Sequence, residues 1–338
     1  MKNILLVVLL MASVIFSQTT ENPDISVIGD LIINQDGDIS SSGAELAIQG
    51  YVNPFARADV FLHKHANYEA IHLEEVVISF ERGLPFDLGL RVGKFRPDIG
   101  KINKEHAHTL FFIEAPKSMK DMLGEEMWGT LGFEANWLAP LPWYTKLSAG
   151  YFTKELGASC SHGEVEGETE GDEIVPVTTA ISTRLSHSFD LSDVAHLEVG
   201  SGYYRDIENN QSPHLHHAFE LDFKYKWRPN TYKSIVWQGE VFRKSPIENP
   251  DNKSKLAGYS WINYQFDKRW NIGFIADYSS GIEEQEYNSF GSFIGFSPAE
   301  ESSVFRLTLS HQNHGEDTSL NVLGQIIWAL GPHKPHQF

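Results

Sequence analysis

Cysteine is almost absent from this chain of 338 residues, in which Cys160 is the only one. A single cysteine excludes an internal disulfide framework and every zinc site built from several cysteines. No run of 18 or more apolar residues is present, as a membrane-spanning helix would need. Basic residues are also scarce, with 27 Lys and Arg against 45 Asp and Glu and a formal net charge of −18. This balance argues against a nucleic-acid partner, because phosphate binding needs basic residues on a shared surface.

The N-terminal residues have the pattern of a secretory signal peptide. Lys2 precedes an almost unbroken apolar run at 4–16, and Ser17 offers a small residue for cleavage before Gln18. The run is too short to span a bilayer as a stable helix. We therefore predict a signal peptide over 1–17 and a single exported domain over 18–338, without an inner-membrane anchor.

The rest of the chain is built from amphipathic segments of about ten residues. In the clearest of them, 218–228, aromatic and aliphatic residues such as Phe219 and Leu221 alternate with charged residues such as Glu220 and Asp222. In a soluble sandwich one face would bury a row of charges, whereas a water-filled lumen solvates them. The alternation predicts an all-β fold, a transmembrane antiparallel β-barrel of the bacterial outer membrane.

The same alternation predicts about 16 strands, with a range of about 14 to 18 because some segments are weak. The expected strands are 25–34, 45–52, 55–63, 71–82, 87–96, 127–138, 144–153, 175–188, 195–205, 217–228, 232–242, 256–266, 270–278, 289–297, 303–311 and 319–329. Connectors after even strands are compact, as at Asn53 and Pro54, and those after odd strands are longer, above all 97–126, 154–174 and 243–255. This difference is typical of short periplasmic turns and long extracellular loops.

One of the long connectors, 97–126, is unusually apolar and contains residues such as Phe112 and Met119. Such a loop can fold into the barrel and narrow the lumen, which would place His106 and His108 beside the permeation path. The alternative is a loop that packs on the rim or against a neighbouring subunit.

Charged residues of the predicted strands are candidates for lining the lumen. They are Arg57, Asp59, Arg91, Lys94, Glu220, Asp222, Lys224, Glu240 and Arg306. Both signs are present, which favours a transverse electric field over strong selectivity for anions or cations.

Histidines gather in the predicted outer loops, and neutral imidazole is a common ligand of zinc, copper and nickel. The candidate metal ligands are His63, His65, His106, His108, His214, His216 and His217. Nothing in the pattern requires a cofactor, so zinc or another divalent cation would be a solute or a ligand. Solvated histidines are the alternative, because His is an ordinary polar loop residue.

Catalytic motifs are absent, since the chain has no nucleophile elbow, Walker loop or His-Glu-x-x-His sequence. A triad of Ser310, His311 and a distant acid would have to form in space, which sequence alone does not reveal. We predict that the protein is not an enzyme.

Several motifs resemble one bacterial family. They are Val92-Gly93-Lys94-Phe95-Arg96, Ile99-Gly100, Asn103, His106-Ala107-His108, Phe112-Ile113-Glu114-Ala115-Pro116 and the C-terminal Gly331-Pro332-His333 with Phe338. They are similar to porin-like proteins often labelled zinc-regulated, TonB-dependent outer-membrane receptors. The resemblance implies a metal role for His106 and His108. The chain departs from TonB-dependent receptors, which have an N-terminal plug domain, because few residues precede the first predicted strand, and we therefore expect a barrel without a plug.

These observations predict a porin-like channel for small solutes. Divalent metal ions are among the candidate solutes, and zinc is the first candidate. The alternative is a non-conducting surface barrel whose His-rich and acidic loops bind metal or a partner. Expected partners are outer-membrane lipid, lipopolysaccharide, further copies of the chain, and the barrel-assembly machinery, to which many barrels present a terminal residue like Phe338.

Overall fold

The computed structural model describes residues 22–66, 70–157, 179–207, 215–247, 254–280, 285–299 and 302–331. The predicted signal peptide, Cys160, His214 and Phe338 lie outside the described residues. Among the described residues, no helix is both long enough and apolar enough to cross a membrane.

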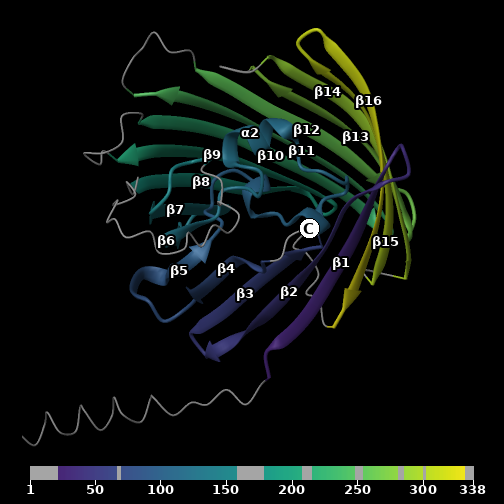
Figure 1. Cartoon of the computed structure of the whole chain (residues 1–338). Helices are drawn as coiled ribbons and strands as arrows, with labels where there is room; N and C mark the ends of the chain where they lie inside the picture. Colours follow the sequence, from purple (N-terminus) through teal and green to yellow (C-terminus); the bar gives the residue numbers. More distant parts are fainter. Residues whose placement is uncertain are drawn as a thin grey trace, which may run out of the picture.

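Sixteen antiparallel strands form one closed barrel, in which every strand pairs with its sequence neighbours and β1 pairs with β16 (Figure 1). The strands are β1 (Asp24–Asn34), β2 (Ile39–Asn53), β3 (Ala56–His65), β4 (His72–Phe80), β5 (Leu88–Phe95), β6 (Thr130–Leu138), β7 (Tyr144–Phe152), β8 (Thr179–Ser192), β9 (Ala195–Ile207), β10 (His216–Asn230), β11 (Lys233–Pro246), β12 (Lys255–Gln265), β13 (Trp270–Ser279), β14 (Tyr287–Ala299), β15 (Ser303–His314) and β16 (Asp317–Leu330). The short helices are η1 (Pro85–Asp87), η2 (Ile102–Lys104), η3 (Ala107–Thr109) and α2 (Lys117–Leu123). The predicted fold class and the count of sixteen are confirmed.

Period-two alternation places apolar residues on the outer face and, on strands such as β10, polar residues inside. On β10, Phe219 and Leu221 are 54% and 60% exposed on the outer face, while Glu220 is 1% exposed within the barrel. Glu220 lies across from Gly202 of β9 and Phe242 of β11 in register. An exposed apolar outer face with a polar interior is the arrangement that a barrel needs in lipid.

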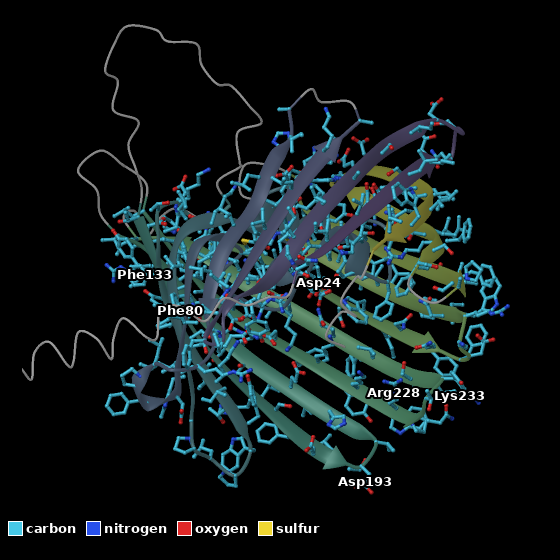
Figure 2. All side chains as sticks on the ribbon, turned by 90° about the horizontal axis from the view of Figure 1, so that it is seen from below. Asp24, Phe80, Phe133, Asp193, Arg228 and Lys233 are labelled. Atoms are coloured by element: carbon cyan, nitrogen blue, oxygen red, sulfur yellow. The ribbon has the colours of Figure 1, made fainter. Side chains whose placement is uncertain are left out.

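The two rims differ in their connections. The short-turn rim carries the tight links 54–55, 193–194 and 231–232, and Figure 2 shows Asp193, Arg228 and Lys233 toward this end of the barrel. At the opposite rim the prediction of long loops after odd strands is only partly right, because β1 and β2 are joined by 35–38 and β15 and β16 by 315–316. The first of these is tight because the Asn34 side chain accepts hydrogen bonds from the backbone N–H groups of Asp36 and Asp38.

The outer face of β10 offers a test of which side chains face lipid and which face the lumen. Phe223 packs against Trp237 of β11, with 4.8 Å between ring centroids. Phe223→Arg is expected to destabilise the folded barrel by about 2–4 kcal/mol, the cost of a guanidinium near the bilayer midplane. The measurement is the denaturant midpoint of the protein refolded in lipid vesicles. Lys224→Ala is the matched control and should be tolerated, whereas equal effects of the two would invert the assigned faces.

Candidate functional site

The segment between β5 and β6, residues 96–129 and here named the β5–β6 loop, lies inside the barrel (Figure 1). Its helix α2 packs against β12 and β13. Ile99, Met119 and Met122 of this loop are completely buried. Water does not solvate such side chains well, so their burial against the inner wall favours the folded-in position of the loop.

Aromatic side chains join the β5–β6 loop to one half of the inner wall. Phe112 lies 6.2 Å from Trp261 of β12 and 5.7 Å from Phe293 of β14, measured between ring centroids. Trp128 makes edge contacts with Phe152 of β7 and Tyr204 of β9, at 5.1 and 5.2 Å. This half of the lumen is therefore filled by an apolar core rather than by water.

Asp98 is the centre of an ionic anchor at the start of the loop. Its carboxylate lies 2.6 Å from the Nζ atoms of both Lys104 and Lys146 and 3.5 Å from Nε of Arg184. Burial would raise the pKa of Asp98, but Lys104, Lys146 and Arg184 outweigh it and hold that pKa well below its ordinary value. The loop is thereby tied to β7 and β8 by charges that persist at neutral pH.

Arg184 extends this anchor to β10. Its Nη1 atom lies 2.9 Å from Glu220 and 2.5 Å from Asp222, and all three side chains are almost completely buried. Lys101 of the loop lies 3.6 Å from Asp222 and 2.5 Å from Glu198. Glu220 and Asp222 are thus buried in the contacts that hold the loop, whereas the Glu198 side chain is 46% exposed.

Glu240 of β11 binds the backbone of the loop at residues 101 and 102. Its Oε2 atom accepts hydrogen bonds from the backbone N–H groups of Lys101 and Ile102, both at 3.2 Å, and from the Tyr259 hydroxyl at 3.0 Å. This approach requires glycine at position 100, because Gly100 has φ +65° and a Cβ there would lie 1.6 Å from Oε1 of Glu240.

Gly100→Ala is expected to loosen the loop, since alanine in the left-handed region costs about 1–2 kcal/mol and its methyl group displaces Glu240. Hydrogen exchange of residues 98–104 measures the effect, and protection should fall. Gly129→Ala is the control, because no heavy atom lies within 4 Å of a Cβ built there. Unchanged protection in Gly100→Ala would mean that Glu240 does not hold the loop.

Against the opposite wall, His106 of the β5–β6 loop is surrounded by three carboxylates. Its Nδ1 lies 3.0 Å from Oε2 of Glu45 on β2 and 3.4 Å from Oε2 of Glu74 on β4. Its Nε2 lies 3.4 Å from Oε1 of Glu75. Glu45, Glu74 and His106 each offer one ligand atom, and these atoms lie within 4.8 Å of one another, as in a potential metal site.

A β-bulge explains why two consecutive glutamates both face inward. The register between β3 and β4 shifts at this point, so that Phe61 is paired with Glu75 but Leu62 with Leu73. Glu74 is the extra residue, and a bulge re-aims the side chains around it. Leu73 and Val76 on either side remain exposed on the outer face.

Four predicted metal-ligand histidines meet in this region. His63, His65, His106 and His108 line a cavity of about 270 Å³ together with Glu45 and Glu74. The rings of His63 and His65 lie 4.1 Å apart, and His63 Nδ1 lies 3.3 Å from Glu74. His108 Nδ1 lies 3.7 Å from Glu45, and His65 Nε2 lies 4.0 Å from Glu126.

The charge of His106 follows from this environment. Burial and the nearby Arg96 guanidinium would lower its pKa, but Glu45 and Glu74 outweigh them and raise the pKa of His106 well above its ordinary value. A positive charge, whether a proton or a metal ion, is therefore stabilised between these carboxylates.

The two candidate histidines of β10 do not join this group. His216 and His217 are neighbours on β10 and face opposite sides of the barrel wall, because side chains alternate along a strand. His216 belongs to a second group with Glu155 and Asp206, while His217 lies beside the outward-facing Phe219, 5.7 Å between ring centroids.

Most of the charged residues expected to line the lumen do face inward, but many are paired. Arg57 lies 2.7 Å from Asp59, and Arg91 lies 3.3 Å from Glu134. Arg306 donates to the backbone carbonyl of His108 at 2.8 Å. Glu220, Asp222 and Glu240 hold the β5–β6 loop as described above, and Lys224 lies between Glu198 and Gln238 in register.

The lumen-facing prediction for Lys94 is wrong. Lys94 lies across from Val76 and Leu131, both of which are exposed on the outer face, and its Nζ donates to the backbone carbonyl of Leu73. Arg91 and Lys94 are three positions apart, so one strand cannot direct both to the same side.

Sequence patterns did not predict a site role for Glu45, Glu74, Arg96, Asp98 and Arg184. Arg184 and Glu45 do occupy inward positions of alternating strands, and that periodicity was the available signal. Glu74 was hidden by the bulge, and Asp98 lies in a loop without periodicity.

No protein-family model matches the chain. An uncharacterized protein of Aquifex aeolicus (strain VF5) is 25% identical over 342 residues, covering 90% of this chain and 71% of that protein.

Solved structures share the fold at low sequence identity. Pseudomonas putida OprB has a TM-score of 0.63 at 11% identity, covering 91% of this chain and 94% of its own. The anion-selective porin of Comamonas acidovorans has a TM-score of 0.56 at 7% identity, covering 91% and 98%. The trimer form of Vibrio cholerae OmpT has a TM-score of 0.55 at 10% identity, covering 91% and 98%.

The chain is therefore a bacterial outer-membrane β-barrel with porin-like architecture. The comparisons do not support the zinc-regulated or TonB-dependent part of the resemblance seen in the sequence.

Proposed function

We propose that this protein is a porin-like channel through the outer membrane for small polar solutes, and that the β5–β6 loop forms its constriction. The observation that carries the proposal is a closed barrel, apolar outside, whose inner wall holds a long loop within the lumen through the Asp98, Arg184 and Glu240 contacts. A loop anchored in this way narrows the passage and brings chosen side chains to it. Catalysis is not part of the proposal, and the structural relatives include porins.

We assign a divalent metal ion to the lumen, as a transported solute or a bound ligand, and zinc is the first candidate. Support comes from Glu45, Glu74 and His106, which offer oxygen and nitrogen atoms at one place on the wall. A homotrimer is the assembly that we propose, by analogy with the trimer form of Vibrio cholerae OmpT.

A second candidate is a non-conducting barrel that captures metal at its surface. One observation favours it: polar contacts of the β5–β6 loop reach strands around the barrel, including Glu45 of β2, Arg184 of β8, Asp277 of β13 and Arg306 of β15. A loop held on so many sides can close the lumen as well as narrow it.

Swelling of liposomes that contain the refolded protein separates the two candidates. The channel admits small sugars and amino acids, and the rate of swelling falls steeply as solute size increases. A folded barrel that admits none of these solutes would favour the capture function instead. Heat-modifiable migration on a gel establishes that the protein is folded in both cases.

A further inference from the structure

We infer that Glu45, Glu74 and His106 bind a divalent transition-metal ion, and that the bound ion latches the β5–β6 loop to the wall formed by β2, β3 and β4. Metal binding at this site does not depend on conduction. The effect of the latch on permeation rests on the proposed channel function.

The distances from Nδ1 of His106 to the two carboxylates are close to those between ligands of a tetrahedral site. Ligand bonds of about 2.0–2.2 Å place neighbouring ligands of a tetrahedral zinc ion about 3.3–3.6 Å apart. Nδ1 of His106 lies 3.0 Å from Glu45 and 3.4 Å from Glu74. Small side-chain movements therefore suffice to admit an ion, and Nδ1 of His108, 3.7 Å from Glu45, stands near a fourth position.

The side chains around these ligands also have the arrangement typical of metal sites. A metal-bound histidine usually donates its other ring N–H to a carboxylate, which orients the ring. Nε2 of His106 lies 3.4 Å from Glu75, so coordination through Nδ1 leaves Nε2–H facing that carboxylate. Arg96 lies 3.6 Å from the same Oε2 atom of Glu74 that faces His106, so it helps to hold that carboxylate in place.

Glu45 supplies independent support for a bound cation. Its side chain is 9% exposed, and its Oε1 atom is buried without a hydrogen-bond partner among the described residues. A buried carboxylate oxygen left in this state is costly, and a cation in the adjoining cavity would satisfy it.

The latch follows from where the ligands lie along the chain. Glu45 and Glu74 belong to the rigid wall, whereas His106 belongs to the β5–β6 loop, between η2 and η3. An ion that needs all three ligands binds only while the loop holds its place against this wall, so binding stabilises that arrangement. Occupied sites should therefore give a less mobile loop.

A second group on the other wall supplies the matched control. Glu155, Asp206 and His216 also bring three donor atoms within 4.8 Å, but Asp206 already accepts a hydrogen bond from the His216 backbone N–H at 2.8 Å and another from the Tyr204 hydroxyl. We therefore assign the ion to the His106 group.

The test is titration of the refolded full-length protein in detergent with ZnCl2, followed by calorimetry, and with CoCl2, followed by visible absorption. Wild type should bind one ion in the His106 group, and Glu45→Gln and His106→Gln should each weaken binding at least tenfold. Glu45→Gln keeps the shape of the side chain, so loss of folding is not the expected cause of weaker binding. His216→Asn should bind as wild type does.

Hydrogen exchange with and without Zn²⁺ reads the latch itself. Added Zn²⁺ should slow exchange in residues 102–110 of wild type and of His216→Asn, and should have no effect in Glu45→Gln. The inference is overturned if wild type binds neither ion, if binding is lost in His216→Asn but kept in Glu45→Gln, or if bound ion leaves exchange unchanged. Absence of conductance alongside normal zinc binding would instead count against the channel function only.

Discussion

Excision of residues 101–126, with a short Gly-Ser link in their place, is expected to raise the single-channel conductance several-fold. The physical reason is that this segment fills one half of the lumen with a core that includes Phe112 and Met119. Without it, ions pass along a wider path through water, and the electrostatic barrier falls. Planar-bilayer recording in 1 M salt measures the change.

Folding of the excised variant needs a separate control, because the aromatic residues of the wall lose their partners. The Gly100→Ala variant keeps the whole loop and only loosens its anchor at Glu240, so it should give more frequent openings at nearly wild-type conductance. Unchanged conductance in a correctly folded excision variant would show that the β5–β6 loop is not the constriction.

Arg184→Met is expected to destabilise the barrel by about 3–5 kcal/mol, the usual cost of removing one partner from a buried ionic group. Glu220 and Asp222 would lose the guanidinium that lies 2.9 and 2.5 Å from them, and Asp98 would keep Lys104 and Lys146 but lose its third positive partner. Urea unfolding in lipid vesicles, followed by tryptophan fluorescence, measures the loss.

Two further variants isolate the charge from the packing of Arg184. Adding Glu220→Gln and Asp222→Asn to Arg184→Met should recover a large part of the stability, because the neutral amides need no counter-charge. Arg228→Met near the exposed rim should change stability by no more than about 0.5 kcal/mol. If Arg184→Met is as mild as Arg228→Met, the buried network does not stabilise the barrel.

Much of the wall was predictable because each strand of a barrel obeys a local rule. Lipid on one side and the lumen on the other impose a period of two. Together with the alternation of short and long connectors, this period located sixteen strands and the inward face of β10. Lys94 and Glu74 are the failures of that rule. Lys94 was placed against the period, and Glu74 is inserted by a bulge that no periodic pattern reveals.

The site was predictable only in its residue types. His-x-His spacings identified His106 and His63 as candidates, but the carboxylates that surround His106 come from β2 and β4, and Glu45 is 61 residues away along the chain. Such a group exists only after the barrel closes around the β5–β6 loop. For the same reason, sequence proximity grouped His216 with His217, which the strand directs to opposite faces.

Single-channel recording of the refolded protein in a planar bilayer, with and without micromolar Zn²⁺, tests the channel function most directly. A porin-like channel narrowed by the β5–β6 loop should give small, steady conductance steps, and Zn²⁺ should reduce or close them in wild type but not in Glu45→Gln. A barrel that migrates as folded on a gel and yet passes no current would contradict the channel and favour metal capture.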